Sequence, residues 1–399
     1  MSFDLISLPL SEIATFKYGK TIRKQDIEDA GLYPVHSGYT TVGYLPSYMY
    51  EEPQLMIVCR GAGGTGDIKM SPPKVSITNL AIVITCDESK VCKDYLYWVL
   101  KLADTYSLRT GSAQPQITIN SLDSFNVVIH QDLSIQRSIA DFLDKLDLKI
   151  GVNSQTNQTL ESIVQAIFKS WFVDFDPVKA KMNGEQPEAM DAATASLFPE
   201  KLVESELGLI PDGWDASSMG EHFNITMGQS PKGETYNEDG EGIAFFQGRR
   251  DFGFRYPDVR VYTTDPKRHA KAGDTLISVR APVGDKNMAA INCCIGRGVA
   301  AIKHKSQSRS FTYAFVSHIE KKLSDSGSSG TVFSSINQNE LKKVSFIAPP
   351  QDLIEAFHKL VDPIDQKIEV LSEEIKSLSA MRDTLLPKLL SGEIELEVR

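Results

Sequence analysis

The sequence repeats itself at a nearly constant interval, and this repeat constrains the fold more than any other feature. The stretch "LMIVCRGAGGTGDI" from Leu55 has a relative, "TLISVRAPVGDKNM", 220 positions later. The matching positions are Ile57 with Ile277, Arg60 with Arg280 and Gly64 with Gly284. Three matches are few, so the interval has to recur elsewhere.

The interval does recur, in two further places. "GSAQPQITINSLDSFNV" from Gly111 resembles "GSSGTVFSSINQNELKKVSF" from Gly327, with Ile119 aligned to Ile336 at a shift of 217. "DLKI" and "DQKI" align at a shift of 218. A nearly constant shift over most of the chain indicates an internal repeat of roughly half its length. Two copies are too few for a solenoid, so we expect two similar domains related by an approximate two-fold.

The glycine-rich stretch after Leu55 superficially resembles a phosphate-binding loop. Such a loop needs Lys and Ser or Thr directly after its last glycine, whereas Asp67 follows Gly66. A dinucleotide fingerprint would open a helix, which Pro72 and Pro73 block. We therefore expect a tight turn between two strands, where glycine supplies positive φ.

Apolar residues at steps of three and four predict one long helix after each domain. The first seam is Ile135, Ile139, Phe142, Leu146, Ile150, Asn153, Asn157, Leu160, Val164, Ile167 and Trp171. The second is Phe357, Leu360, Ile364, Lys367/Ile368, Leu371, Ile375, Leu378, Met381/Arg382, Leu385 and Leu389. Each helix can be the other's partner in an antiparallel coiled coil. A helix of about 40 residues spans on the order of 60 Å, long enough to act as a ruler.

Polar residues interrupt both seams. Asn153 and Asn157 would fix the register of a buried seam, or face solvent at a loosened crossover. Asp362-Pro363 suggests either a kink or a new helix with proline in its first turn. Between the repeats, prolines divide Trp171 to Trp214 into short pieces, which indicates a long surface connection with a helical turn or two near "DAATASLF".

Charge is distributed unevenly along the chain, whose net charge is −10. The window 241–310 holds thirteen basic and six acidic residues, and the window 131–240 holds eight basic and nineteen acidic residues. The basic window could face DNA while the acidic one stays away from it, or it could simply be solvated. With no basic segment before the first apolar residues and no apolar run near the roughly 18 residues of a membrane span, we expect a cytoplasmic protein without a membrane partner.

Three segments carry a resemblance to a known family. They are "KSWFVDFDPVKAKMNGEQPEAMDAATASLFP" followed by "SELGLIPDGW", the domain start "ITMGQSPKGETYNEDGEGIAFFQG", and the ending "LLPKLLSGEIEL". Together they resemble the specificity subunit of a type I restriction-modification system, over essentially the whole chain. The first domain matches mainly by architecture.

The predicted fold class is α+β, with two similar mixed α/β target recognition domains joined by two long antiparallel coiled-coil helices. We expect recognition domain 1 at 1–130, spacer helix 1 at 131–173, a connecting linker at 174–206, recognition domain 2 at 207–349, and spacer helix 2 with the C-terminal tail at 350–399.

The resemblance implies that each domain reads one half of a split site in double-stranded DNA while the helices set the spacing. It implies two modification subunits, which carry S-adenosylmethionine and methylate adenine, and restriction subunits that cleave DNA with ATP and magnesium. This chain would then hold no cofactor.

Candidate DNA-binding residues are basic or amide side chains near predicted loops, since arginine suits guanine and glutamine suits adenine. In the first domain they are Lys17, Lys20, Arg23, Lys24, Arg60, Arg109, Gln114 and Gln116. In the second they are Gln229, Ser230, Lys232, Gln247, Arg249, Arg250, Arg255, Arg280 and Lys286. Any one of them could contact a phosphate instead of a base.

No catalytic or metal-binding residues are predicted. The Pro-Pro pairs in "SPPK" and "APPQ" do not fit an adenine methyltransferase motif, and the seven histidines are scattered without ligand spacing. Two alternatives stay open: a coiled-coil scaffold that binds proteins instead of DNA, and a self-sufficient nuclease, for which "EIK" and "EKK" are weak signals because Glu-x-Lys is common on helix surfaces.

Overall fold

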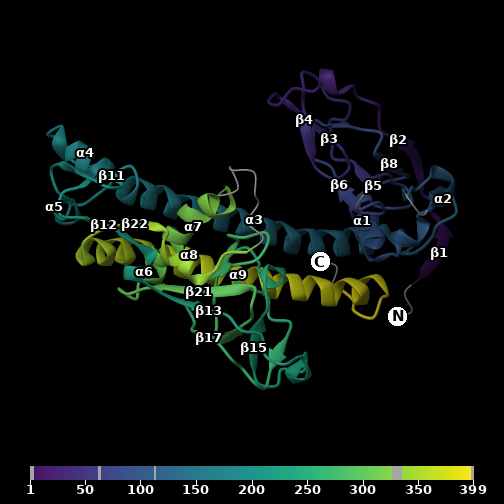
Figure 1. The fold of residues 1–399 in the computed structure, drawn as a ribbon. Helices are drawn as coiled ribbons and strands as arrows, with labels where there is room; N and C mark the ends of the chain where they lie inside the picture. The colour runs from purple at the N-terminus through teal and green to yellow at the C-terminus, as the bar shows by residue number, and fades with distance from the viewer. Residues whose placement is uncertain (1–3, 62–63, 112–113, 326–334, 397–399) are drawn as a thin grey trace. The chain divides into compact units, whose positions relative to one another are not determined.

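The computed structural model describes residues 4–61, 64–111, 114–325 and 335–396. The chain forms two compact units: unit 1 is Met1–Val152 with Glu374–Arg399, and unit 2 is Asn153–Glu373. Two 40-residue helices, α3 (Leu133–Phe172) and α9 (Gln351–Leu390), each contribute one half to each unit (Figure 1). Both units mix helices with sheets, which confirms the predicted α+β class.

Unit 1 holds three sheets, with strand orders β1-β9, β2-β8-β5-β6 and β4-β3-β7. The strands are β1 (Leu5–Pro9), β2 (Ala14–Tyr18), β3 (Tyr33–His36), β4 (Thr41–Leu45), β5 (Leu55–Val58), β6 (Ile68–Met70), β7 (Ser76–Ile77), β8 (Ala81–Cys86) and β9 (Asn126–His130). The short helices are α1 (Lys93–Leu102) and α2 (Ile119–Asp123). Helix α1 packs on β5, β6 and β9.

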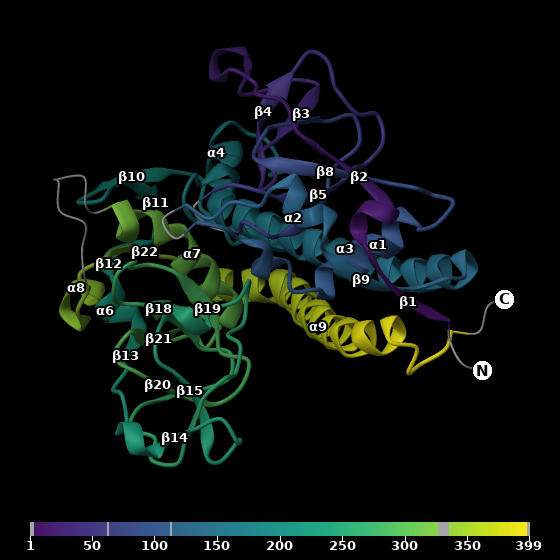
Figure 2. The same cartoon turned by 90° about the vertical axis from the view of Figure 1, so that its right-hand side faces the viewer.

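Unit 2 holds the sheets β10-β11, β12-β22, β13-β21-β18-β19 and β14-β16-β15-β20-β17. The strands are β10 (Leu202–Ser205), β11 (Gly208–Pro211), β12 (Asp215–Ser218), β13 (Phe223–Met227), β14 (Tyr236–Asn237), β15 (Ile243–Phe246), β16 (Tyr262–Thr263), β17 (His269–Ala270), β18 (Thr275–Ser278), β19 (Lys286–Met288), β20 (Cys293–Ile295), β21 (Val299–His304) and β22 (Ser345–Ala348). Its short helices are α4 (Asp176–Met182), α5 (Ala192–Ser196), α6 (Met219–His222), α7 (Arg309–Asp325) and α8 (Gln338–Lys342). Helix α7 packs on β18, β19 and β21, as Figure 2 shows.

The two units share the topology of two of their sheets, which confirms the internal repeat. The four-stranded sheet β2-β8-β5-β6 corresponds strand for strand to β13-β21-β18-β19, and the pair β1-β9 corresponds to β12-β22. Helices α3 and α9 begin at Leu133 and Gln351, 218 positions apart. The glycine-rich stretch after Leu55 does connect two antiparallel strands, β5 and β6, but the connection runs over residues 59–67 and is a loop where a tight turn was expected. In the Gly327 stretch, residues 326–334 lie outside the described residues.

The long helices run antiparallel within each unit. In unit 1, Arg382 Nη1 of α9 lies 2.6 Å from Asp147 Oδ1 of α3. In unit 2, Asn157 Nδ2 donates to Ser372 Oγ at 3.2 Å. Asn153 and Asn157 are only 2% and 1% exposed, so the solvent-facing alternative for them is wrong. A polar side chain in a buried seam favours one register over its neighbours.

The second seam differs from the prediction in its first turns. Helix α9 continues through Pro363, so no new helix begins there. Leu360 is 46% exposed, whereas the neighbouring Val361 is fully buried. Asp365 is also fully buried, one turn further along. A carboxylate occupies an interior position that periodicity alone would assign to an apolar side chain.

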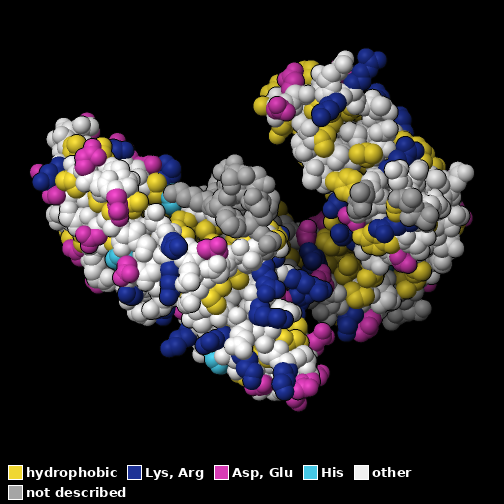
Figure 3. Space-filling view, viewed as in Figure 1, with side chains coloured by type: hydrophobic (Ala, Val, Ile, Leu, Met, Phe, Trp, Pro, Cys, Tyr) yellow, Lys and Arg dark blue, Asp and Glu magenta, His cyan; other side chains and the backbone are white. Residues whose placement is uncertain are grey.

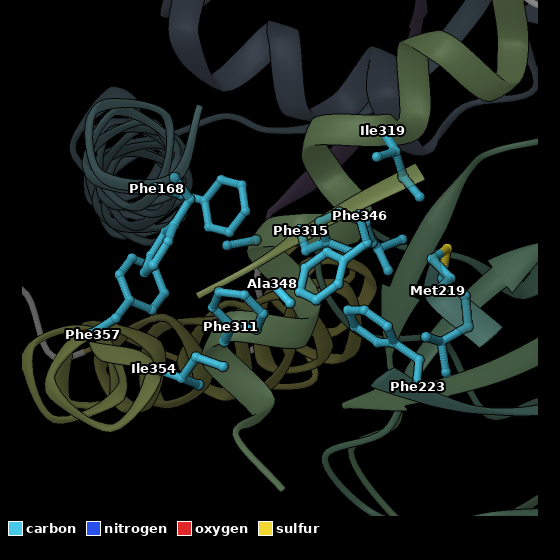
Figure 4. Packing of buried hydrophobic residues seen from close by; sticks show 14 of the residues in the cluster. Phe168, Met219, Phe223, Phe311, Phe315, Ile319, Phe346, Ala348, Ile354 and Phe357 are labelled. Carbon is cyan, nitrogen blue, oxygen red and sulfur yellow. The ribbon is translucent and has the colours of Figure 1, made fainter. Parts of the chain in front are cut away.

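An aromatic cluster forms the centre of unit 2 (Figure 4). Phe168 of α3 and Phe357 of α9 meet edge to face at 5.9 Å between ring centroids, and the ring of Phe311 of α7 lies 5.7 Å from the first and 6.2 Å from the second. Such pairs add about 0.5–1.5 kcal/mol beyond their burial. The connection after α3 joins this cluster through Phe175, Val178 and Phe198, so the expected surface wrap is wrong for these residues. Its predicted helical turn near "DAATASLF" is confirmed as α5.

Aspartates at equivalent repeat positions tie each domain to the helix that follows it. In unit 1, Trp98 Nε1 of α1 donates to Asp144 Oδ1 of α3 at 2.7 Å. In unit 2, Arg309 Nε of α7 donates to Asp362 Oδ1 of α9 at 2.8 Å. Asp144 and Asp362 are again 218 positions apart. The repeat therefore preserves the carboxylate while its donor changes.

Unit 2 should lose stability in mild acid through His304. Burial, His222 and Lys305 lower the pKa of His304 from 6.5 to about 4. Because the unfolded chain takes up this proton near pH 6.5 and the folded unit only near pH 4, stability falls as the pH drops between these values. We expect a loss of at least about 1 kcal/mol, or roughly 2–4 °C in melting temperature. Calorimetry of wild type and H304Q from pH 7 to 4 measures it.

The exposed His269 offers a matched control, because H269Q removes a histidine without removing a buried one. An H304Q melting curve that keeps the full pH dependence would contradict this assignment.

Candidate nucleic-acid interface

Three segments of the first domain meet beside the end of β5. The residue after Cys59, Arg60, forms a backbone bridge with Gln116, and Ile117 N donates to Cys59 O at 3.0 Å. The Arg60 guanidinium lies 5.5 Å from the centroid of the Tyr18 ring at the end of β2. Arg60 and Gln116, far apart in sequence, therefore lie together and are both exposed.

Arg109 also contacts the loop that follows β5. Its Nε donates to Thr65 O at 2.6 Å, and its guanidinium lies 4.2 Å from the centroid of the Tyr106 ring. Tyr106 in turn donates to Asp67, a hydrogen bond that raises the pKa of Tyr106. Arg109 is thus exposed but held in position, a favourable arrangement for a donor that must present a fixed geometry to a base. Gln114 is exposed nearby in the chain.

Two tyrosines shape the glycine loop. Tyr39 donates from its hydroxyl to Arg60 O at 2.9 Å. Gly61 has φ 133°, and a Cβ there would lie 2.2 Å from the Tyr39 hydroxyl oxygen. A Cβ at Gly66 would lie 2.9 Å from the Tyr106 ring. The glycines therefore allow the close approach of the rings that position Arg60 and Arg109.

The remaining basic candidates of the first domain lie in a different segment of the chain, in and after β2. Lys17 lies in β2, and Lys20, Arg23 and Lys24 follow it; all four are exposed. Within the described residues none of these four side chains makes an ion pair. Their charges are therefore open to solvent.

In the second domain, three segments meet at the turn between β20 and β21. Gln229 N donates to Ile295 O at 2.9 Å, and Arg297 N donates to Ser230 Oγ at 3.2 Å. Gly298 N donates to Gln247 O at 3.1 Å. The structure thus brings together Gln229, Ser230 and Gln247 and adds Arg297, an exposed residue that the sequence analysis missed.

A groove of about 710 Å³ opens beside Gln247. It is lined by Tyr236, Glu238, Phe245, Gln247, Gly248, Arg250, Asp251, Arg260 and Val261. Asp251 forms an ion pair with Arg260 and accepts from Gln247 N at 3.2 Å. Arg250 is exposed at the groove. An arginine, a glutamine and two aromatic rings at one groove suit contact with base edges.

Three other basic candidates of the second domain form ion pairs with Asp or Glu side chains. Arg249 pairs with Asp285, and Lys286 Nζ lies 2.7 Å from Glu320 Oε2. Lys232 and Glu234, both exposed, lie 3.7 Å apart. The exposed Arg280 forms a backbone bridge with Ser335. Figure 3 shows several Lys and Arg side chains, with acidic ones among them, over the part of unit 2 that holds β15.

The pattern that defines the type I restriction modification DNA specificity domain matches residues 7–162 and 211–380 of this chain. The putative type I restriction enzyme MjaX specificity subunit of Methanocaldococcus jannaschii is 30% identical over 325 residues, 79% of this chain and 71% of that protein. The type I restriction enzyme HindI specificity subunit of Haemophilus influenzae is 31% identical over 336 residues, 70% of this chain and 71% of that protein.

This chain belongs to the type I restriction-modification specificity subunit family. Its fold agrees: the crystal structure of the type I restriction-modification S subunit from M. genitalium superimposes with a TM-score of 0.68, at 17% identity, over 98% of this chain and 96% of that one.

As a type I specificity subunit, the chain is a DNA-recognition component of a restriction-modification complex and not an enzyme. The scaffold alternative has no support among its relatives. Within the described residues no group of three or more His, Cys, Asp and Glu side chains could hold a metal ion. None of the described helices is long and apolar enough to cross a membrane.

Arg255 lies in a place that does not fit its assignment as a DNA-binding residue. Its side chain is 1% exposed and forms ion pairs with Glu161 of α3 and Asp365 of α9. Burial lowers the pKa of this guanidinium, but Tyr313, Glu161 and Asp365 raise it by more, so it stays charged. With its charge already satisfied inside the unit, Arg255 is not open to a base, and we remove it from the candidate contacts.

The residues that sequence reasoning missed share one property. Tyr39, Tyr106 and Asp67 act by holding an arginine in position. Tyr39 bonds to Arg60 at a separation of 21 positions and Asp67 to Tyr106 at 39, whereas Tyr106 lies close in sequence to Arg109. The glycines at 61, 64 and 66 were the available signal, because glycines this closely spaced allow positive φ and the close approach of other side chains. Residues 62–63 of this loop lie outside the described residues.

Alanine at Gly61 should displace the glycine loop of this specificity subunit. The new Cβ would collide with the Tyr39 hydroxyl in a backbone conformation that alanine rarely adopts. We expect unit 1 to lose about 1–3 kcal/mol in free energy of unfolding. Urea unfolding measures this loss. The double variant G61A/Y39F, which removes the clashing oxygen, should recover part of it, and equal stability of G61A and wild type would refute the packing argument.

Proposed function

We propose that each domain reads one half of a split DNA site. Domain 1 would use Arg60, Arg109 and Gln116, and domain 2 would use Gln229, Gln247 and Arg250. The observation that supports this is that both domains place exposed arginine and glutamine side chains on loops of one repeated topology. The repeat supplies the same scaffold twice, while the residues on its loops differ, as two different half-sites require.

The chemistry of these side chains fits base readout. Arginine donates two hydrogen bonds to guanine O6 and N7, and glutamine bonds adenine N6 and N7, each pair contributing about 1–3 kcal/mol of discrimination. The exposed residues Lys17, Lys20, Arg23 and Lys24 would contact phosphates and position the domain. In domain 2, Ser230, Lys232, Arg249, Arg280 and Lys286 would do so.

The chemistry would come from partners in the cytoplasm. In this proposal two modification subunits bring S-adenosylmethionine and methylate adenine, and restriction subunits bring ATP and magnesium for cleavage. A base to be methylated must leave the stack and enter a pocket, a step that belongs to the modification subunit. This chain chooses where that step takes place.

Loop substitutions should alter one half-site at a time. R60A/Q116A should relax the sequence of the first half-site, and Q247A/R250A that of the second, with each lost contact costing about tenfold or more in discrimination. Single-molecule methylation mapping of DNA from cells that express each variant with the modification subunit reads both half-sites at once.

The variant K24A is the matched control, because loss of a phosphate contact weakens binding uniformly and leaves base preference intact. If either loop variant relaxed both half-sites, or if wild type gave no methylated split motif while the complex formed, half-site reading would be refuted.

The helices also offer two equivalent surfaces for two copies of one partner. Val152 and Met381 of unit 1 are 50% and 48% exposed, and Ile163 and Val370 of unit 2 are 42% and 59% exposed. Val152 and Val370 are related by the 218-residue shift of the repeat, and so are Ile163 and Met381. Each unit thus exposes one apolar residue from each helix at positions related by the repeat. We assign the helix surfaces that carry these residues to the two modification subunits.

Charged substitutions should remove these partners one by one. We expect V152E/M381E to leave a complex with one modification subunit instead of two, and I163E/V370E to do the same, since an ionised carboxylate opposes burial of the helix surface. Native mass spectrometry counts the subunits. The variant L32E changes an equally apolar residue, 80% exposed in recognition domain 1, and should keep both partners. Two bound subunits in every variant would refute the docking assignment.

A further inference from the structure

One buried arginine connects three parts of unit 2 that are distant in sequence. Arg255 forms ion pairs with Glu161, 94 positions away on α3, and with Asp365, 110 positions away on α9. Its guanidinium also lies 3.6 Å from the centroid of the Tyr313 ring of α7. Arg255 and Asp365 are both essentially excluded from solvent. The side chain therefore joins a loop of the recognition domain to both long helices.

Arg255 ends the loop that presents the exposed side chains of domain 2. This loop, residues 247–255, begins with Gln247 and includes Arg249 and Arg250. Its middle is held by Asn287, which donates from Nδ2 to Gly253 O at 2.9 Å and accepts from Gly253 N at 3.0 Å.

The rest of the loop is fastened by backbone and carboxylate contacts. Met288 N donates to Arg255 O at 2.8 Å. Asp251 accepts from Gln247 N at 3.2 Å and binds Arg260. Contacts thus fasten the loop at Arg255, at Gly253 and at Asp251, between the buried guanidinium and the exposed glutamine.

Stability alone does not explain a buried ion cluster of this kind. Removing charges from water is costly, and apolar residues of similar volume often give equal or greater stability. Two atoms of the cluster, Arg255 Nε and Asp365 Oδ2, lack a hydrogen-bond partner among the described residues, which adds to that cost. The cluster instead fixes the orientation of the Arg255 side chain. Two carboxylates on two helices accept only one orientation of a planar guanidinium. This fixes geometry where an apolar contact would allow sliding.

We propose that Arg255 is a positioning residue for DNA recognition, whose ion pairs with Glu161 and Asp365 set the 247–255 loop against the helices so that Gln247 and Arg250 meet their bases in fixed geometry. The inference rests on the proposed reading of the second half-site by this loop. Arg255 itself touches no base. It acts on specificity through the loop and leaves the first half-site untouched.

The test uses the full complex of this chain with its modification subunits. The variant R255M/E161Q/D365N removes all three charges together, so no carboxylate is left buried and unpaired. Methylation rates are measured on DNA with single-base changes in either half-site. Discrimination is ordinarily about tenfold to a hundredfold per base pair; we expect it to fall by about fivefold or more in the second half-site and to stay unchanged in the first.

Two further variants separate positioning from general damage. R255K keeps the charge but loses the planar fork, and should show a smaller loss with the same half-site selectivity. R268M changes an exposed arginine of the same domain and should leave discrimination in both half-sites intact.

The outcomes are distinct for the inference and for the proposed function. Equal loss in both half-sites, or undiminished discrimination in the triple variant, would overturn the positioning role while half-site reading stands. A wild-type complex that methylates DNA without discriminating bases in either half-site would overturn the proposed function itself.

Discussion

Carboxylates on the two long helices are the constraint on which both recognition domains depend. Asp144 and Asp362 occupy equivalent positions, and each accepts a hydrogen bond from the domain that precedes its helix. One turn further on, Asp147 and Asp365 are equivalent as well, yet Asp147 pairs with Arg382 of the opposite helix and Asp365 with Arg255 of the recognition loop. In both halves the aspartate acceptor on the helix is the same, whereas the donor side chain differs. Domains with different surfaces can therefore pack on equivalent helices.

The ion pairs of Asp147 in unit 1 and Asp365 in unit 2 differ in their burial. The Asp147–Arg382 pair is partly open to solvent, where an ion pair contributes little. The Arg255 cluster is closed, so its geometry is strict and the loss of one partner is costly. A large aromatic cluster surrounds the same helices in unit 2. In domain 2 the recognition loop is therefore tied to both helices by a buried ion cluster as well as by apolar packing.

The repeat and the long helices could be predicted because their signals are periodic and extend over many residues. Seam positions such as Ile139, Val164 and Ile368 are buried as the pattern requires. Arg255 could not be predicted, because its partners are 94 and 110 positions away and nothing in "GFRYPD" distinguishes a buried arginine from an exposed one. Tyr39 escaped for the same reason, because it bonds to Arg60 at a separation of 21 positions. The periodicity of the sequence predicts the repeat and the long helices, whereas the contacts that orient single side chains can be found only in the three-dimensional structure.

Each unit is assembled from two distant pieces of the chain, since the first half of one helix and the second half of the other belong together. A chain of half the length would have one domain and one long helix. It would lack the half-helix of the second long helix that packs in each unit. Two such chains would complete each other by exchanging helix ends. The single chain therefore joins in one molecule the arrangement that two half-length chains would form as a symmetric dimer, and its two halves can differ in their loops.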